Sequence, residues 1–296
     1  MSGPLLVALD IDGTLLTYDE ELSPAVAQAV AAVHAAGHHV VLATGRSVFA
    51  TVPVAHLLGI TVGWAVCSNG SVTVRLDPDL PGGHEIVETV TFDPGPAVRL
   101  MSAALPDACF AVEELGVGFR LTKPFPDGEL RGEQTVVPLS ELMQGRVTRL
   151  IVRSPEHTPE EFHELVVRAG LSDVTYAVGW TAWMDVAPEG VTKASALEGL
   201  RERLAVDPAA TVAIGDGSND VDMVRWAARG VAMGHSPVVL LDVADEVTGS
   251  IEQDGAVPVL LSLTAGVAGL QGVPARGAAA DPLVDPAPAE EHNPFS

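Results

Sequence analysis

The sequence is poor in cysteine and in long apolar runs. Its two cysteines, Cys67 and Cys109, match neither a metal-ligand spacing nor a disulfide framework, so we expect two reduced, buried thiols. No apolar run approaches the ~20 residues that a membrane-spanning helix needs, so we expect no membrane partner. The N-terminus has no basic segment before an apolar one; we therefore expect no signal peptide and a cytoplasmic protein.

Positive charge is also scarce. The 296 residues include 16 lysines and arginines against 39 aspartates and glutamates, a formal net charge of −23. This balance argues against the basic surface that nucleic-acid binding needs. It also means that an anionic substrate must be bound by local positive charge, because the overall field repels it. The phosphate-binding pattern G-x-x-x-x-G-K-[ST] does not occur in the sequence.

Short apolar segments, typical of buried strands, alternate with helical patterns towards both ends of the chain. Residues 5–9 form one such segment, and HVVLATGR at 39–46 and WAVCSNG at 64–70 contain two more. A helix is predicted between the first two, with Ser23 as its N-cap and Gly37 at its end. This alternation predicts an α/β fold, a doubly wound parallel sheet with covered faces.

The middle of the chain has a different pattern. Half-polar strands in HEIVETVTF, CFAVEEL, RLIVRS, VTYAVGW and AWMDVAP, with the amphipathic helix TPEEFHELVVRAG, predict an inserted α+β module with an antiparallel sheet. After Pro188 the first pattern returns. We therefore predict a core domain of residues 1–82 and 187–270 and an inserted domain of residues 83–186. Residues 271–296, rich in proline, alanine and acids, predict a disordered tail.

Polar clusters follow the predicted core strands, at the edge where open parallel sheets bind ligands. They are DIDGT at 10–14, ATGR at 43–46, SNG at 68–70 and GDGSND at 215–220. If the clusters meet, four carboxylates converge, and like charges at close range raise one another's pKa. The four are Asp10, Asp12, Asp216 and Asp220. A hard divalent cation relieves the repulsion, and Mg²⁺ prefers carboxylates together with water and a substrate phosphate.

The same edge carries groups that suit a bound phosphate. Lys193, in the first turn of its helix, supplies positive charge, while Thr44 and Gly45 supply hydrogen-bond donors. Asp10 comes directly after its strand, where a carboxylate is placed rigidly enough to attack phosphorus and form an aspartyl-phosphate. Asp12 would protonate the leaving oxygen and later activate water. The paired carboxylates thus predict a two-step phosphoryl transfer from a small phosphorylated substrate.

These motifs resemble the haloacid dehalogenase (HAD) superfamily. D-x-D-G-T-L at 10–15, a strand ending in T-G-R, a helix-borne lysine and G-D-G-x-N-D at 215–220 occur in that order. The stretches VAPEGVTKASAL, GDGSNDVDM, GVAM and ADEVTGSIEQDG resemble the Cof-type branch of sugar phosphatases, and the likeness covers about residues 5–265. The sequence departs from that branch at 234–236, where Gly-His-Ser stands in place of the common Asn-Ala.

The resemblance implies a role for each matching residue. Asp10 would be the nucleophile and Asp12 the acid/base, while Thr44 and Lys193 would bind phosphate. Asn219 would lie beside the metal and the phosphate. Mg²⁺ would be held by Asp10, Asp216, Asp220 and the backbone carbonyl of Asp12. The inserted domain would be a class IIB cap that closes over the site.

Several positions keep two interpretations. Arg46 is either a phosphate contact or a surface ion pair, and Asn69 is either a site residue or a turn residue with satisfied hydrogen bonds. Trp180 and Trp183 form either cap core or a platform for a sugar or base ring. The loop KPFPDGELRGE at 123–133 either carries substrate specificity or is a solvated turn.

The leading hypothesis is a Mg²⁺-dependent HAD-family phosphatase, a phosphoric monoester hydrolase acting on small phosphorylated metabolites such as sugar phosphates. A phosphomutase or phosphotransferase on the same core is the alternative among enzymes, and a non-catalytic phosphometabolite-binding protein is the alternative outside them. A dehalogenase is disfavoured, because that chemistry needs neither a metal nor a proton donor two residues after the nucleophile. We expect a monomer or a homodimer, with no nucleic-acid partner.

Overall fold

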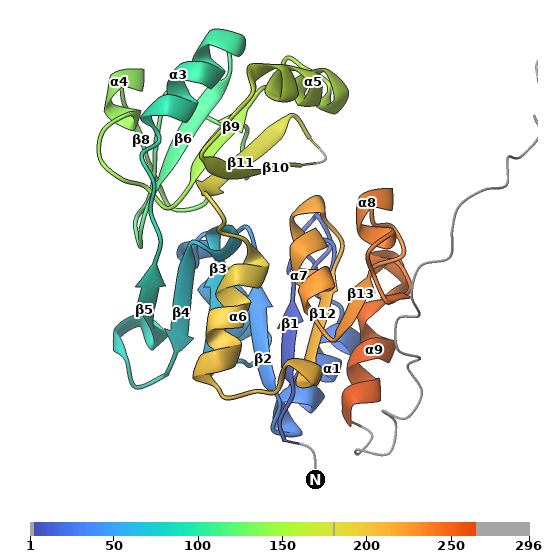
Figure 1. The fold of residues 1–296 in the computed structure, drawn as a ribbon. Helices are drawn as coiled ribbons and strands as arrows, with labels where there is room; N and C mark the ends of the chain where they lie inside the picture. Colours follow the sequence, from blue (N-terminus) through green and yellow to red (C-terminus); the bar gives the residue numbers. More distant parts are fainter. Residues whose placement is uncertain (1–2, 180, 265–296) are drawn as a thin grey trace, which may run out of the picture.

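The computed structural model describes residues 3–179 and 181–264, which form two lobes, each built on its own sheet (Figure 1). Trp180 and the predicted disordered tail, residues 271–296, lie outside the described residues. In the part that is described, no helix combines the length and the apolar character required to cross a membrane.

The lower lobe in Figure 1, the core, contains an eight-stranded sheet. Its order is β14-β13-β12-β1-β2-β3-β4-β5, with parallel pairing from β14 to β3 and antiparallel pairing from β3 to β5. The strands are β1 (Leu6–Leu9), β2 (His39–Ala43), β3 (Gly63–Cys67), β4 (Val72–Leu76), β5 (His84–Thr89), β12 (Thr211–Gly215), β13 (Arg229–Ala232) and β14 (Glu246–Val247). The parallel arrangement of β1, β2, β3 and β12 brings their carboxyl ends to one edge.

Helices cover both faces of the core sheet. They are α1 (Pro24–Ala35), α2 (Val48–Leu57), α6 (Lys193–Arg203), α7 (Val221–Trp226), α8 (Val238–Leu241) and α9 (Ala256–Thr264). The central strand β1 divides its side chains between the two faces: Val7 and Leu9 pack in one cluster with α1, α2 and α9, whereas Leu6 and Ala8 pack in another with α6 and α7. The predicted doubly wound α/β architecture is confirmed.

The upper lobe, the cap, contains a six-stranded sheet of order β10-β11-β9-β6-β7-β8. Its strands are β6 (Cys109–Glu114), β7 (Gly118–Leu121), β8 (Glu133–Val136), β9 (Leu150–Arg153), β10 (Val174–Val178) and β11 (Trp183–Pro188). The helices α3 (Gly95–Ala104), α4 (Leu139–Leu142) and α5 (Pro159–Ala169) complete it. Helices α3 and α5 lie on the side of the sheet away from the core, so the opposite face of the sheet is turned toward the core (Figure 1).

One strand lies in a different lobe from the one the sequence predicts. The sequence predicts segment 84–92 to be part of the inserted domain, but β5 pairs antiparallel with β4 in the core sheet. The assignment is wrong because a half-polar pattern suits any strand with one wet face, and β5 is the edge strand of the core sheet. At the other boundary, β11 belongs to the cap sheet as far as Pro188. The two lobes are therefore connected after β5 and after β11.

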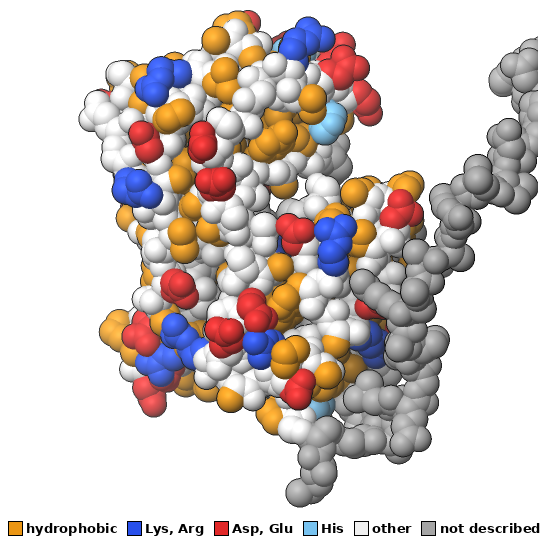
Figure 2. Space-filling model, viewed as in Figure 1, with side chains coloured by type: hydrophobic (Ala, Val, Ile, Leu, Met, Phe, Trp, Pro, Cys, Tyr) orange, Lys and Arg blue, Asp and Glu red, His pale blue; other side chains and the backbone are white. Residues whose placement is uncertain are grey.

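Acidic and basic side chains are interspersed on the face of the molecule shown in Figure 2. On helices α6 and α7, Arg201 pairs with Glu198 and Arg225 pairs with Asp222. Most of the scarce positive charge on these two helices is thus balanced locally.

Candidate active site

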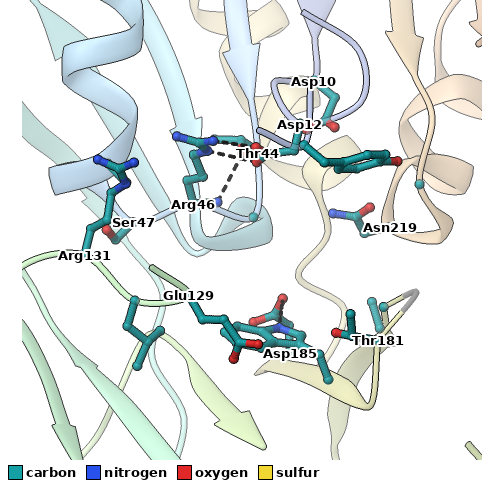
Figure 3. A pocket seen from close by; sticks show the side chains of 18 of the residues that line it. Asp10, Asp12, Thr44, Arg46, Ser47, Glu129, Arg131, Thr181, Asp185 and Asn219 are labelled. Carbon is teal, nitrogen blue, oxygen red and sulfur yellow. Dashed lines mark hydrogen bonds and ion pairs between the residues drawn. The ribbon is translucent and has the colours of Figure 1, made fainter. Parts of the chain in front are cut away.

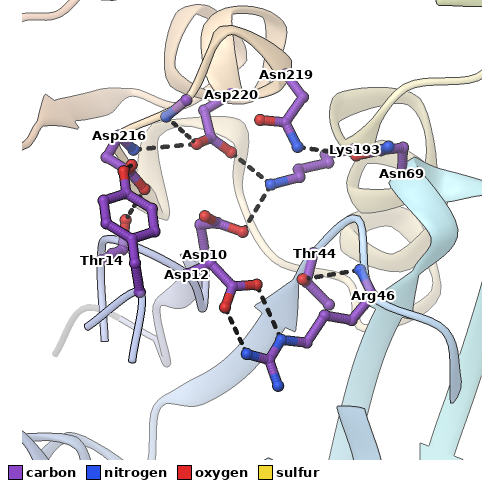
Figure 4. Close-up of polar contacts among 12 residues, drawn as sticks. Asp10, Asp12, Thr14, Thr44, Arg46, Asn69, Lys193, Asp216, Asn219 and Asp220 are labelled. Carbon is purple, nitrogen blue, oxygen red and sulfur yellow. Dashed lines mark hydrogen bonds and ion pairs between the residues drawn. The ribbon is translucent and has the colours of Figure 1, made fainter. Parts of the chain in front are cut away.

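The polar clusters predicted from the sequence meet at the carboxyl ends of β1, β2, β3 and β12 (Figure 4). Asp10, Asp216 and Asp220 each offer a carboxylate oxygen within 4.8 Å of the others, and all three residues are buried. Burial raises the pKa of Asp10 well above its ordinary value, and the neighbouring carboxylate of Asp220 raises it further. Burial and Asp220 raise the pKa of Asp216 in the same way. This cluster therefore favours a cation.

Lys193 supplies one positive charge to the aspartate cluster from the first residue of α6. Its Nζ donates to Oδ1 of Asp10 and to Oδ1 of Asp220, at 2.7 Å in each case. Burial alone would lower the pKa of this ammonium, but the two carboxylates outweigh it and raise the pKa above its usual range. The helix start is held by a capping box, in which Thr192 accepts from the Ser195 backbone and Ser195 accepts from the Thr192 backbone. Lys193 is thus a charged, positioned group.

The other two aspartates are held by hydrogen bonds to the surrounding loops. Asp220 Oδ2 accepts from the backbone N–H groups of Asp216 and Gly217, at 3.0 and 2.9 Å. Asp216 accepts from the Thr14 hydroxyl at 2.9 Å and from the Tyr18 hydroxyl at 2.7 Å. The loop after β1 packs tightly against Asp216 at Gly13, whose backbone has φ +78°. A Cβ atom at this position would lie 2.6 Å from the carboxyl carbon of Asp216. Only glycine fits there.

Asp12 differs from the expected arrangement. Its side chain is not in the group of three aspartates; instead both carboxylate oxygens accept from Arg46, one of them from Nε at 2.9 Å. Arg46 also pairs with Glu20 at 3.1 Å; its side chain is 13% exposed, whereas those of Asp12 and Glu20 are each 39% exposed, so Arg46 forms a partly exposed ion pair at the cavity wall. Burial opposes the charge on Arg46, yet Asp12 raises its pKa. Four carboxylates do not converge, because Arg46 neutralises the fourth.

The loops after β2 and β3 are tied together beside the cluster. The backbone N–H of Asn69 donates to the Thr44 carbonyl at 3.0 Å, and the Thr44 hydroxyl accepts from the Arg46 backbone at 3.1 Å. The Asn69 side chain, in turn, accepts from Nδ2 of Asn219 at 2.9 Å (Figure 4). Asn69 has a left-handed backbone, φ +53°, which asparagine tolerates better than most residues. Thr44, Asn69 and Asn219 thus lie around one end of the site.

A cavity of about 640 Å³ opens between the core and the cap (Figure 3). Its core wall includes Asp10, Asp12, Thr44, Gly45, Arg46, Asp216 and Asn219. Its cap wall includes residues 127–131 of the predicted loop and Trp183, whose ring packs edge-on against Phe125 at 5.8 Å. Trp183 therefore packs in the cap and lines the cavity at once. The size suits a small molecule.

Among residues 3–179 and 181–264, three polar contacts join the cap to the loops of the core around this cavity. Arg131 pairs with Glu20. The Ser218 hydroxyl donates to the Val178 carbonyl at 3.1 Å. The Ser68 hydroxyl donates to Glu113 at 2.6 Å, and Glu113 is a buried carboxylate of β6. The cap thus contacts the loops that follow β1, β3 and β12.

The cluster fits a hard divalent cation by its chemistry. Asp10, Asp216 and Asp220 offer carboxylate oxygens, the ligands that Mg²⁺ prefers, and three negative charges face the single positive charge of Lys193. These residues would hold the ion beside the cavity. Sequence reasoning missed Tyr18, which touches Asp216, as well as Glu113, Arg149 and Asp185 of the cap. Their partners are distant in the sequence, so no spacing pattern marks them.

The sequence matches a family model described as haloacid dehalogenase-like hydrolase over residues 7–106 and 124–260. A phosphoglycolate phosphatase from Archaeoglobus fulgidus is 30% identical over 261 residues, which span 88% of this chain and 97% of that protein. The 5-amino-6-(5-phospho-D-ribitylamino)uracil phosphatase YitU from Bacillus subtilis is 26% identical over 274 residues, 87% of this chain and 96% of that protein.

Solved structures share the fold. The HAD subclass IIB sugar phosphatase BT4131 superposes with a TM-score of 0.71 at 22% identity, over 87% of this chain and 98% of that one. A haloacid dehalogenase-like hydrolase from B. subtilis superposes with a TM-score of 0.73, also at 22% identity, over 86% of this chain and 98% of that one. Both lobes therefore follow a known architecture.

Proposed function

We propose a function for this chain, which belongs to the haloacid dehalogenase-like hydrolase family and is a phosphoric monoester hydrolase of that family. Its proposed substrates are small phosphorylated metabolites, sugar phosphates foremost. The proposed cofactor is Mg²⁺, and the proposed intermediate is an aspartyl-phosphate on Asp10. One observation carries the proposal. Asp10, Asp216 and Asp220 meet beside a cavity that Asp12 also lines, and Lys193 pairs with Asp10 and Asp220.

In the proposed first step, a carboxylate oxygen of Asp10 attacks phosphorus and the bond from phosphorus to the leaving oxygen breaks. Asp12 gives its proton to the leaving oxygen. In the structure both carboxylate oxygens of Asp12 accept from Arg46 at the cavity wall, so Asp12 must take up a proton and turn away from Arg46 before this step. Lys193 orients Asp10 through the contact of 2.7 Å and offsets negative charge beside it.

In the second step, Asp12 takes a proton from a water molecule, which attacks phosphorus and releases inorganic phosphate from Asp10. Thr44, Gly45 and Asn219 are proposed to bind the phosphate oxygens, and the Asn69–Asn219 hydrogen bond supports the position of Asn219. Bound Mg²⁺, held by Asp10, Asp216, Asp220 and the Asp12 carbonyl, would supply charge stabilisation for the phosphoryl group.

The test is the release of inorganic phosphate by the purified chain with Mg²⁺, from a panel of sugar monophosphates and from p-nitrophenyl phosphate. Hydrolysis of several sugar monophosphates supports the proposal. Interconversion of phosphate isomers without phosphate release would contradict hydrolysis and indicate a mutase. Binding of these esters without turnover would indicate a non-catalytic protein.

A further inference from the structure

The cap wall of the cavity carries five charged side chains, which we call the roof: Asp127, Glu129, Arg131, Arg149 and Asp185. In Figure 3, Glu129 and Asp185 of the roof lie across the cavity from Asp10, so the part of the substrate that leaves with its oxygen would lie against the roof. Whether that part can carry a charge depends on which roof residues are free to bind it.

Both arginines of the roof are already paired with carboxylates. Arg149 Nε donates to Asp185 Oδ1 at 2.6 Å, and the two side chains are only 9% and 16% exposed. Asp185 Oδ2 also accepts from the indole N–H of Trp183 at 3.1 Å, so Asp185 is fixed from two sides. Arg131 is paired with Glu20 from the core. An anionic leaving group at either arginine would therefore meet a carboxylate that already neutralises the positive charge of that arginine.

The charge balance around the leaving-group region is negative. The roof has three carboxylates against two arginines, and beside it the core wall adds the carboxylates of Asp19 and Glu20 and the guanidinium of Arg46, so that five carboxylates face three arginines. A second anionic group on the substrate would be repelled in a partly dehydrated cavity, where charges interact more strongly than in water. Hydroxyl groups, in contrast, can donate hydrogen bonds to these carboxylates. Phe119, Leu130 and Trp183 add apolar surface for the carbon skeleton.

We propose that the enzyme selects phosphate monoesters whose leaving group is an uncharged polyol or sugar. We also propose that Asp185 is a specificity-determining residue, because its carboxylate pairs with Arg149 and neutralises the guanidinium. This inference rests on the proposed function. Asp185 acts by pairing with Arg149: its carboxylate neutralises the guanidinium, and without that carboxylate the charge of Arg149 is free to attract an anion.

The experiment compares two esters of the same length, glucitol 6-phosphate and 6-phosphogluconate, which differ at the far end by a hydroxymethyl group against a carboxylate. We expect the wild-type kcat/KM to favour glucitol 6-phosphate by about tenfold or more, the size of one charge-assisted hydrogen bond. Asp185→Asn should reduce this ratio about tenfold by improving kcat/KM for 6-phosphogluconate. A thermal melt of each variant establishes that it is folded.

Glu129→Gln is the matched control. It also removes a carboxylate from the roof, but it releases Arg153, which pairs with Glu129 at 3.0 Å and is not among the lining residues. The ratio should change much less than in Asp185→Asn. In the double variant Asp185→Asn/Arg149→Gln, the improvement on 6-phosphogluconate should disappear, because the anion receptor is gone.

An equal change of the ratio in Glu129→Gln, or an improvement that survives the loss of Arg149, would overturn the role of Asp185. So would a wild-type enzyme that hydrolyses p-nitrophenyl phosphate and does not discriminate between the two six-carbon esters; the proposed function would then stand. If neither these esters nor p-nitrophenyl phosphate releases phosphate, the proposed function fails, and this inference fails with it.

Discussion

The ammonium nitrogen of Lys193 lies 2.7 Å from a carboxylate oxygen of Asp10, although 183 residues separate the two in the sequence. Both residues are buried, and the same nitrogen donates to Asp220. A buried charge that has lost its partner is costly, whereas the loss of both partners costs less. Lys193 is therefore as important to the stability of the cluster as to its proposed chemistry.

We predict that Lys193→Met destabilises the protein by about 3–5 kcal/mol, because two buried carboxylates lose their shared cation. Chemical denaturation without divalent cations measures this loss. The double variant Lys193→Met/Asp10→Asn should recover part of the stability, since one of the orphaned charges is removed with its partner. A double variant less stable than Lys193→Met would contradict this account of the cluster.

We predict that Asp10→Asn abolishes phosphate release, with a loss in kcat of at least about a thousandfold, because the amide cannot serve as the nucleophile. Stability should be unchanged or higher, since a like charge whose burial is unfavourable has been removed from the cluster. Steady-state kinetics and a thermal melt measure the two effects. Asp222→Asn, an exposed carboxylate paired with Arg225, is the control and should keep wild-type kinetics. Near wild-type turnover in Asp10→Asn would exclude this residue as the nucleophile.

Removal of divalent cations by EDTA should stop hydrolysis, and added Mg²⁺ should restore it. Mg²⁺ should also raise the melting temperature, because a ligand that binds only the folded state stabilises it. The Mg²⁺-dependent rise should be much smaller in Asp216→Asn, which lacks one of the proposed ligands. A rise of equal size in wild type and Asp216→Asn would place the ion elsewhere.

Glu113 should make stability depend on pH. Burial raises its pKa above the ordinary value of 4.5, although Arg149 and the Ser68 hydroxyl oppose the shift. Between 4.5 and the raised native pKa, the folded state binds more protons than the unfolded state, so the free energy of unfolding falls as pH rises. In Glu113→Gln this carboxyl group is absent, so the variant does not lose unfolding free energy in this way as pH rises. Its melting temperature relative to wild type should therefore increase with pH across that window.

The control for Glu113 is Glu133→Gln on the exposed strand β8. Its melting temperature relative to wild type should stay constant over the same pH range. If Glu113→Gln behaves like this control, the buried carboxylate does not determine the pH dependence of stability.

Much of the core could be predicted from local sequence. Short apolar strands that are followed by aspartate or threonine indicate a parallel sheet. The carboxyl ends of parallel strands lie at one edge of the sheet, independently of the conformation of the loops. Asp10, Asp216 and Lys193 are therefore found near one another as expected. In contrast, β5 has a pattern that either lobe could use, and only its pairing with β4 assigns it to the core.

The sequence by itself determined which chemical groups stand at the strand ends, because apolar periodicity and short motifs are local properties of the chain. Only the tertiary structure decided their partners: Asp12 with Arg46, Tyr18 with Asp216, and Arg149 with Asp185. The physical reason is that a long charged side chain can pair with any opposite charge within its reach. Which one it reaches depends on how loops and lobes pack, and residues distant in sequence leave no periodic signal of that packing.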